Sequence, residues 1–339
     1  MSDSLVRRIA DAVLYEGYIL WPYRRSALKN QRRWTFGGVY PAAHSAAHPD
    51  DPCVMRTECL LEGPPEATLD VRVRFLHVVA RGVLRAAGAG ALEAGDELTV
   101  GGERHVAWDE AAEREVAIGA LDVGALAERP RSAATDLAAG VAIEELREPD
   151  GALAGALRRS WEPLRGAVEA RAERLGPALW RVGVTIVNTT PFAPGGGRDA
   201  ALGRTFCSTH AVLSAAGGAA FVSLTDPPDA LRGHAAACRN DGTWPVLVGE
   251  PGERHTVLAS PIILEDHPRV APESPGDLFD GAEIDQLLRL SILALTDEEK
   301  AEMRATDPRA REILERTEAL TPEQLMRLHG TVRDLRVRP

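Results

Sequence analysis

The stretch TLDVRVRFLHVVA, residues 68–80, decides the fold class. In its first half Leu69, Val71 and Val73 alternate with polar residues, which is typical of a strand with one face buried and one in solvent. The fuller apolar run at 76–79 then indicates a strand that becomes buried on both faces. The stretch therefore predicts a long strand of a β-rich protein.

Further strands are predicted on both sides of this stretch. Residues 95–108, GDELTVGGERHVAW, favour two short strands around a Gly-Gly turn. Residues 164–188 fit two antiparallel strands joined at 175–177, because Val182, Val184 and Ile186 are β-branched and alternate. A helix over 164–172 also fits the apolar spacing, although the alanine-rich composition of the chain weakens that alternative.

The C-terminal part changes character and predicts short helices. Four helix starts there are marked by side chains that can accept hydrogen bonds from free backbone N–H groups. They are Asp280 with Glu283, Thr296 with Glu299, Asp307 before Pro308, and Thr321 with Gln324. The predicted class is therefore α+β: a β-rich body of two antiparallel, sandwich-like parts with a helical C-terminal region.

A length of 339 residues predicts more than one domain. The polar interval ERPRSAATD, with Pro130, is the best place for a boundary. We therefore expect an N-terminal β-rich domain at 1–128, a second β-rich domain at 129–276 and the helical region at 277–339.

Composition restricts the compartment and the partners. The formal net charge is -11, which opposes nonspecific binding to nucleic acid. No apolar run reaches the 18 or so residues that would cross a bilayer, and the first residues lack the pattern of a secretory signal, so we expect no membrane insertion. Four cysteines without a disulfide-like spacing fit a reducing compartment, and we expect a cytoplasmic protein.

Residues 15–41, YEGYILWPYRRSALKNQRRWTFGGVYP, form what we call the aromatic–basic segment. It holds all four tyrosines, and no acidic residue occurs at 17–49 although 50 of the 339 residues are acidic. Tyrosine, tryptophan and arginine are enriched at interface hot spots, so the segment predicts a docking surface for an acidic protein partner or an anionic ligand. The predicted contact residues are Trp21, Tyr23, Arg24, Arg25, Lys29, Arg32, Arg33, Trp34 and Phe36.

Two other interpretations of the aromatic–basic segment stay open. Its rings could cover the β body while its arginines pair with the chain's own carboxylates. Rings and cations also suit single-stranded nucleic acid, but the net charge and the lack of an RNA-binding consensus disfavour that partner.

Cysteine and histidine spacing raises the alternative of a metal-binding protein or an enzyme with a Cys/His site. Cys207 and His210 lie three residues apart, and His234 and Cys238 lie four apart, so each pair could chelate one ion. A zinc or other transition-metal site would need the fold to bring both pairs together. Buried cysteines acting as small apolar residues are the alternative, and we expect no cofactor.

A dense set of carboxylates precedes the helical region: Glu273, Asp277, Asp280, Glu283 and Asp285. It lacks the spacing of an EF-hand loop, and helix capping explains two of its members. It could bind a metal or present an acidic docking face. No nucleophile-elbow, zinc-protease or Walker motif occurs, so we expect binding rather than catalysis.

Several segments together resemble an uncharacterised actinobacterial protein family whose members are encoded beside actinobacterial-type uptake nickel-iron hydrogenases. The segments are residues 15–41, CVMRTECLLEG at 53–63, CRNDGTWPVLVGE at 238–250, 260–285 and 295–330. The resemblance implies an accessory or assembly role, with a hydrogenase subunit or maturation factor as the partner. It assigns no catalytic residue.

Overall fold

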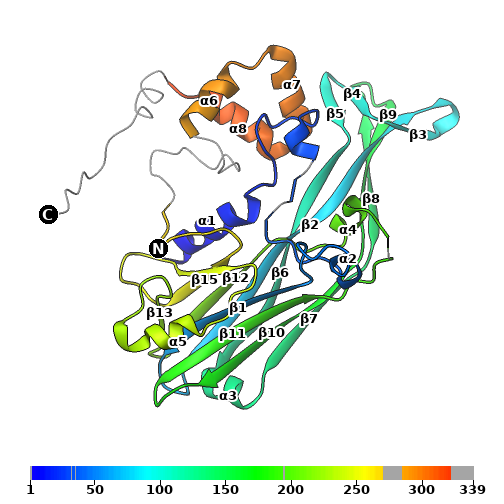
Figure 1. Cartoon of the computed structure of the whole chain (residues 1–339). Helices are drawn as coiled ribbons and strands as arrows, with labels where there is room; N and C mark the ends of the chain where they lie inside the picture. The colour runs from blue at the N-terminus through cyan, green and yellow to red at the C-terminus, as the bar shows by residue number, and fades with distance from the viewer. Residues whose placement is uncertain (1, 32, 35, 194, 270–284, 322–339) are drawn as a thin grey trace.

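The computed structural model describes residues 2–31, 33–34, 36–193, 195–269 and 285–321. Figure 1 shows two antiparallel sheets with a group of helices at one end. The predicted α+β class, with sandwich-like sheets and helices towards the C-terminus, is confirmed. None of the described helices is long and apolar enough to span a membrane.

The first sheet has five strands. In spatial order they are β13 (Ala220–Val222), β1 (Val54–Glu62), β11 (Leu179–Asn188), β10 (Leu164–Arg174) and β7 (Arg131–Leu137). The predicted hairpin at 164–188 is confirmed, because β10 and β11 pair antiparallel from Gly166 opposite Asn188 to Arg174 opposite Trp180. In residues 164–172 the alternation of apolar and polar residues was therefore the correct guide, and the helical spacing was not.

The second sheet is built around one long strand. Its order is β14 (Trp244–Leu247), β15 (Thr256–Ser260), β12 (Cys207–Ala216), β2 (Thr68–Ala86), β9 (Leu153–Trp161) and β8 (Gly140–Arg147), and β6 (Trp108–Asp122) and β3 (Leu92–Gly95) also pair with β2. On one side β2 pairs first with β12 and then, at 80–85, with β9. The predicted Gly-Gly hairpin is β4 (Glu97–Val100) with β5 (Glu103–Val106).

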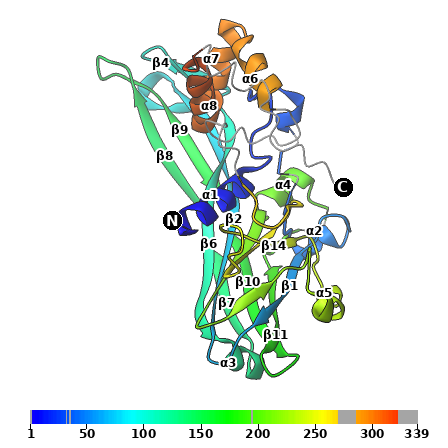
Figure 2. The same cartoon turned by 90° about the vertical axis from the view of Figure 1, so that its left-hand side faces the viewer.

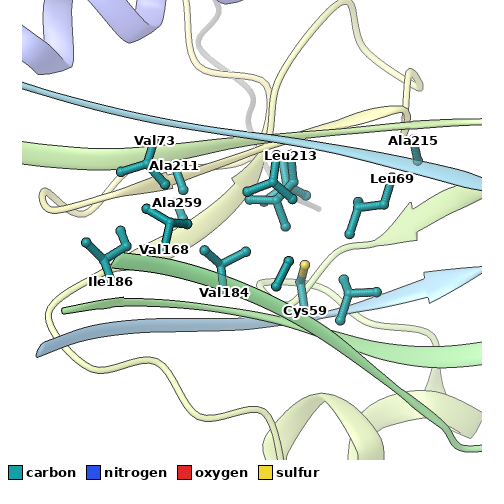
Figure 3. Close-up of a cluster of buried hydrophobic side chains, with 14 of the residues drawn as sticks. Cys59, Leu69, Val73, Val168, Val184, Ile186, Ala211, Leu213, Ala215 and Ala259 are labelled. Atoms are coloured by element: carbon teal, nitrogen blue, oxygen red, sulfur yellow. The ribbon is translucent and has the colours of Figure 1, made fainter. Parts of the chain in front are cut away.

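The main core lies between the two sheets. Figure 3 shows Leu69 and Val73 of β2 facing Val184 and Ile186 of β11 across this space. Leu69 and Val73 are fully buried. Burying one such side chain contributes about 1.5–3 kcal/mol, so the alternation at 68–75 specifies which face of β2 joins the core.

The expected boundary after residue 128 does not divide the molecule. β1, from the first expected domain, pairs with β11 from the second, and β2 likewise pairs with β12. Residues 1–128 and 129–276 thus share both sheets and the core between them. A sheet with one apolar face needs a second layer, and here each range contributes strands to both layers.

The helices are short apart from those near the two ends. They are α1 (Ser2–Tyr15), α2 (Ala42–Ser45), α3 (Val123–Glu128), α4 (Arg198–Leu202), α5 (Arg232–Ala236), α6 (Asp285–Leu293), α7 (Asp297–Thr306) and α8 (Pro308–Glu318). Single 3-10 turns lie at Leu28–Gln31, Gly88–Gly90 and Asp229–Leu231.

Two of the predicted helix caps are confirmed. Thr296 and Glu299 form a reciprocal capping box at α7, and the Asp307 carboxylate accepts from the Arg309 backbone N–H at α8. The cap at 280–283 and the helix expected after Thr321 lie outside the described residues.

A second apolar cluster joins the C-terminal helices to the upper half of β2. Leu76 and Val78 of β2 lie on one side of this cluster, and Met303 of α7 and Ile313 of α8 lie on the other. All four tyrosines of the aromatic–basic segment belong to the same cluster, and the Tyr18 hydroxyl reaches Asp307 at the start of α8. Figure 2 shows α6, α7 and α8 together beside the upper part of the sheet.

Candidate functional site

Most rings of the aromatic–basic segment point inward. All four tyrosines are at most 5% exposed, and Trp34 is 4% exposed. The Tyr18 ring meets the Trp34 ring edge-on, with 5.2 Å between centroids. The prediction of an outward-facing surface is therefore wrong for Tyr23 and Trp34, because the C-terminal helices need apolar side chains between themselves and β2.

The cations of the segment are also occupied within the chain. Arg24 forms an ion pair with Glu299 at 2.9 Å, and Arg25 donates to the backbone oxygen of Asp96 at 3.1 Å. Arg33 is 4% exposed and donates to two backbone oxygens, those of Tyr18 at 3.1 Å and Asp109 at 2.8 Å. These three arginines therefore do not form the outward cationic surface predicted for them.

The remaining predicted contact residues are distributed differently. Lys29 and Phe36 are exposed, and Trp21 is half-buried against Tyr23 with 6.0 Å between ring centroids. Arg32 lies outside the described residues. Trp21, Lys29, Arg32 and Phe36 therefore stay predictions as outward-facing contacts.

The two predicted cysteine–histidine pairs do not meet. Cys207 is buried in the second apolar cluster, and His210, on the same strand, places Nδ1 3.2 Å from the Ser208 carbonyl oxygen. His234 and Cys238 lie at α5, where Cys238 packs against the cluster around Leu60 of β1. The predicted four-ligand metal site is therefore not formed.

No three His, Cys, Asp or Glu side chains are grouped to hold a metal within the residues that the structure describes. Burial raises the pKa of the Cys207 thiol to about 12, so this sulfur is a protonated apolar group at neutral pH. The carboxylates Glu273, Asp277, Asp280 and Glu283 fall outside the described residues, and only the backbone of Asp285 is described.

The structure instead presents an open cleft of about 650 Å³ beside the aromatic–basic segment. Its walls come from that segment, the middle of β2, the start of β6, the end of β9 and the short helix α4. Three of the six tryptophans line it: Trp34, Trp108 and Trp161. A cavity of this size, with aromatic walls and a few polar groups, is typical of a ligand site.

The tryptophans are held in three different ways. Trp34 has a φ of 65°, a left-handed conformation that is strained for a large side chain and persists because its surroundings bury it. Trp108 is stacked under the Arg33 guanidinium, 3.6 Å from the ring centroid, and its Nε1 has no hydrogen-bond partner within the described chain. Trp161 is half-buried and donates from Nε1 to the Ala138 carbonyl oxygen at 3.1 Å.

The four arginines of the cleft are Arg25, Arg33, Arg81 and Arg204. Arg81 forms an ion pair with Glu110 at 2.8 Å and donates to the carbonyl oxygens at the end of α7. Arg204 forms an ion pair with Glu162 at 2.6 Å. Burial lowers the pKa of Arg33, whose guanidinium rests on a ring and two carbonyls rather than on a carboxylate.

Two carboxylates of the cleft stand apart from this network. Asp109 at the start of β6 and Asp199 in α4 form no side-chain hydrogen bond and no ion pair with any described residue. Asp109 reaches solvent through the open cleft, yet the surrounding protein raises its pKa, an effect that Arg33 opposes and Asp199 adds to. A perturbed carboxyl group in a cleft is a functional-site candidate.

No sequence motif points to Trp108, Asp109, Trp161 or Asp199. They lie on three separate elements, and no spacing motif links them. As an arrangement they offer the half-buried Trp161 ring and two exposed carboxylates, which suits binding. No protein-family model matches the chain, and a search of the curated proteins finds no match.

Proposed function

We propose that the chain is a non-enzymatic accessory or assembly protein that docks a protein partner in the cleft of Trp34, Trp108 and Trp161. The observation that carries the proposal is the gathering of three tryptophans and four arginines around one open cleft in a chain with 5% aromatic residues. Tryptophan and arginine dominate the binding energy of protein interfaces.

The state of the potential catalytic groups supports a binding role. The Cys207 thiol is buried and protonated, and burial lowers the pKa of both His77 and His210 to about 4. These histidines are neutral at physiological pH and hidden from a substrate, whereas a general base works best with a pKa near the operating pH and with access to the reacting group.

The resemblance to the hydrogenase-associated family makes a nickel-iron hydrogenase subunit, or one of its maturation factors, the first partner to test. The exposed residues Lys29 and Phe36 belong to the same proposal, as further contacts on the segment that forms one wall of the cleft. We propose no nucleic-acid partner, because a net charge of -11 repels phosphate.

The test is a binding comparison between two tryptophan insertions. Ala200 is exposed and lines the cleft, so Ala200→Trp fills the cleft without removing an existing contact. Ala237 is exposed beside α5, outside the cleft, and Ala237→Trp adds the same ring there as a control. Tagged chains at native expression level are purified by affinity, and binding to purified hydrogenase is measured by biolayer interferometry.

We expect the wild-type chain and Ala237→Trp to retain the partner in stoichiometric amount, and Ala200→Trp to lose at least ten-fold in affinity. If all three chains bind the partner with equal affinity, the cleft is not the docking site. Recovery of no specific partner by any chain would remove the docking function itself.

A further inference from the structure

We infer that the group received by the cleft is cationic: an arginine or lysine side chain of the partner, placed between the Asp109 and Asp199 carboxylates and a tryptophan face. This inference rests on the proposed docking function and specifies its chemistry. The inferred ligand has the opposite charge to the anionic ligand that the composition of the aromatic–basic segment predicted.

The first argument is the balance of charge in the cleft. Arg81 is matched by Glu110, Arg204 by Glu162, and Arg25 by Asp96, whose carboxylate is 3.9 Å away. Arg33 is the remaining arginine of the cleft lining, and it acts on Asp109, while the lining holds two unpaired carboxylates, Asp109 and Asp199. After these pairs are counted, two carboxylates stand against one guanidinium, which leaves a net charge of one negative unit. Both carboxylates, Asp109 and Asp199, are exposed to solvent.

The guanidinium of Arg33, the remaining cation, already has partners within the chain. Both terminal nitrogens of Arg33 donate to backbone oxygens, and one face of its guanidinium covers Trp108. Arg33 opposes the rise in the pKa of Asp109 that burial causes, but it forms no ion pair with Asp109 within 4.0 Å. An incoming cation can therefore approach Asp109 and Asp199 without displacing an internal partner.

A tryptophan ring lines the same cleft as the two carboxylates. Trp161 is half-buried at the end of β9, and Arg33 does not cover it as it covers Trp108. A cation over a tryptophan face gains roughly 0.5–2 kcal/mol, more as it loses water. Arg33 over Trp108 is an example of this pairing inside the same cleft.

The charge of the whole chain acts in the same direction. A net charge of -11 attracts a basic segment at long range and raises its rate of association. An acidic segment would meet both this overall field and the two carboxylates, and each would oppose its binding.

The experiment compares three small probes on the full chain. They are N-acetyl-arginine amide, its neutral isostere N-acetyl-citrulline amide, and N-acetyl-glutamate amide. Shifts of the tryptophan indole N–H resonances follow binding in 50 mM salt, and the Trp161→Phe variant identifies the Trp161 signal. We expect the arginine probe to shift that signal and to bind at least five-fold more tightly than the citrulline probe, with the glutamate probe weakest.

The double variant Asp109→Asn with Asp199→Asn should reduce the arginine preference to less than two-fold. A matched control, Asp50→Asn with Asp226→Asn, removes the same charge from two exposed residues outside the cleft and should keep the preference. Equal binding of the arginine and citrulline probes, tighter binding of the glutamate probe, or a preference that survives in the cleft variant would each overturn the inference.

The two proposals fail separately. If Ala200→Trp abolishes partner binding while the arginine probe shows no preference, the docking function stands and the cationic ligand falls. If the arginine probe binds as expected while Ala200→Trp leaves partner binding intact, the cleft takes a cationic group that is not part of the protein partner.

Discussion

Replacing Tyr18 by phenylalanine should measure how firmly the aromatic–basic segment is fastened inside the molecule. Tyr18 is 1% exposed, and its hydroxyl donates to Oδ2 of Asp307 at 2.6 Å. Asp307 is 2% exposed and caps α8 with its other oxygen. The bond therefore ties residue 18 to residue 307 in a place that water does not reach.

The expected loss of stability follows from the charge of the acceptor. A hydrogen bond to a charged group contributes about 1.5–3 kcal/mol, and a buried carboxylate oxygen without its donor costs the upper part of that range. Phenylalanine keeps the ring packing against Tyr15 and Trp34. We therefore expect Tyr18→Phe to lower the free energy of unfolding by about 2–3 kcal/mol.

Urea unfolding followed by tryptophan fluorescence gives the difference, provided that the slope with denaturant is unchanged. Tyr40→Phe is the matched control, because the Tyr40 hydroxyl accepts only a long bond of 3.4 Å from Arg198. It should cost no more than about 0.5 kcal/mol. If Tyr18→Phe also costs less than about 0.5 kcal/mol, the Tyr18–Asp307 hydrogen bond does not hold the segment inside the molecule. That result would favour the alternative in which the segment faces outward.

Three further results are expected. At pH 8 iodoacetamide should leave Cys207 unmodified, because burial raises its pKa to about 12, while mass spectrometry finds the partly exposed Cys53 alkylated. Burial lowers the pKa of His77 and His210 to about 4 in the folded chain, whereas histidine in the unfolded chain titrates near 6.5. Between these pH values the unfolded chain binds more protons than the folded chain, so the free energy of unfolding should fall as the pH falls from 6.5 to 4, by up to roughly 3 kcal/mol per histidine. His210→Gln should make the urea midpoint less dependent on pH. Arg33→Lys gives up one of two backbone acceptors and the stacked guanidinium, and should destabilise by about 2 kcal/mol in the same urea assay.

Local patterns in the sequence were good guides to local structure. The alternation at 68–75 correctly indicated the buried face of β2, and the capping oxygens of Thr296 and Asp307 correctly indicated where α7 and α8 begin. Each of these signals depends on neighbours within a few residues. Their outcome therefore does not depend on which distant segment packs nearby.

The pairing of strands could not be predicted in the same way. The pattern of β1 is equally compatible with any antiparallel neighbour, and its partner β11 lies more than a hundred residues further along the chain. A polar, alanine-rich interval with one proline indicated a domain boundary at 128/129, but 131–137 forms β7 at the edge of the first sheet. Composition alone does not distinguish a linker from an exposed edge strand, because both are polar.

The aromatic–basic segment shows a different limit. Rings and arginines in one segment fit an outward interface and an inward layer equally well, because both bury aromatic area. What decides between them is whether the arginines find acceptors. Arg24 finds Glu299 and Arg33 finds the Asp109 carbonyl, and both acceptors lie far away in the sequence.

The position of the cleft follows from this inward packing. The segment covers Leu76 and Val78 of β2 and then turns away at Trp34, through a left-handed backbone that the surrounding side chains hold in place. The start of β6 and the helix α4 line the cleft, where the exposed residues Asp109 and Asp199 share the space with Trp34, Trp108 and Trp161. Because Trp34, Trp108 and Arg33 are fixed by packing before any ligand arrives, binding there orders few side chains. Ordering a side chain on binding costs about 0.5–1.5 kcal/mol. Because packing already fixes Arg33 and Trp34, the proposed partner would bind there at a small cost in side-chain entropy.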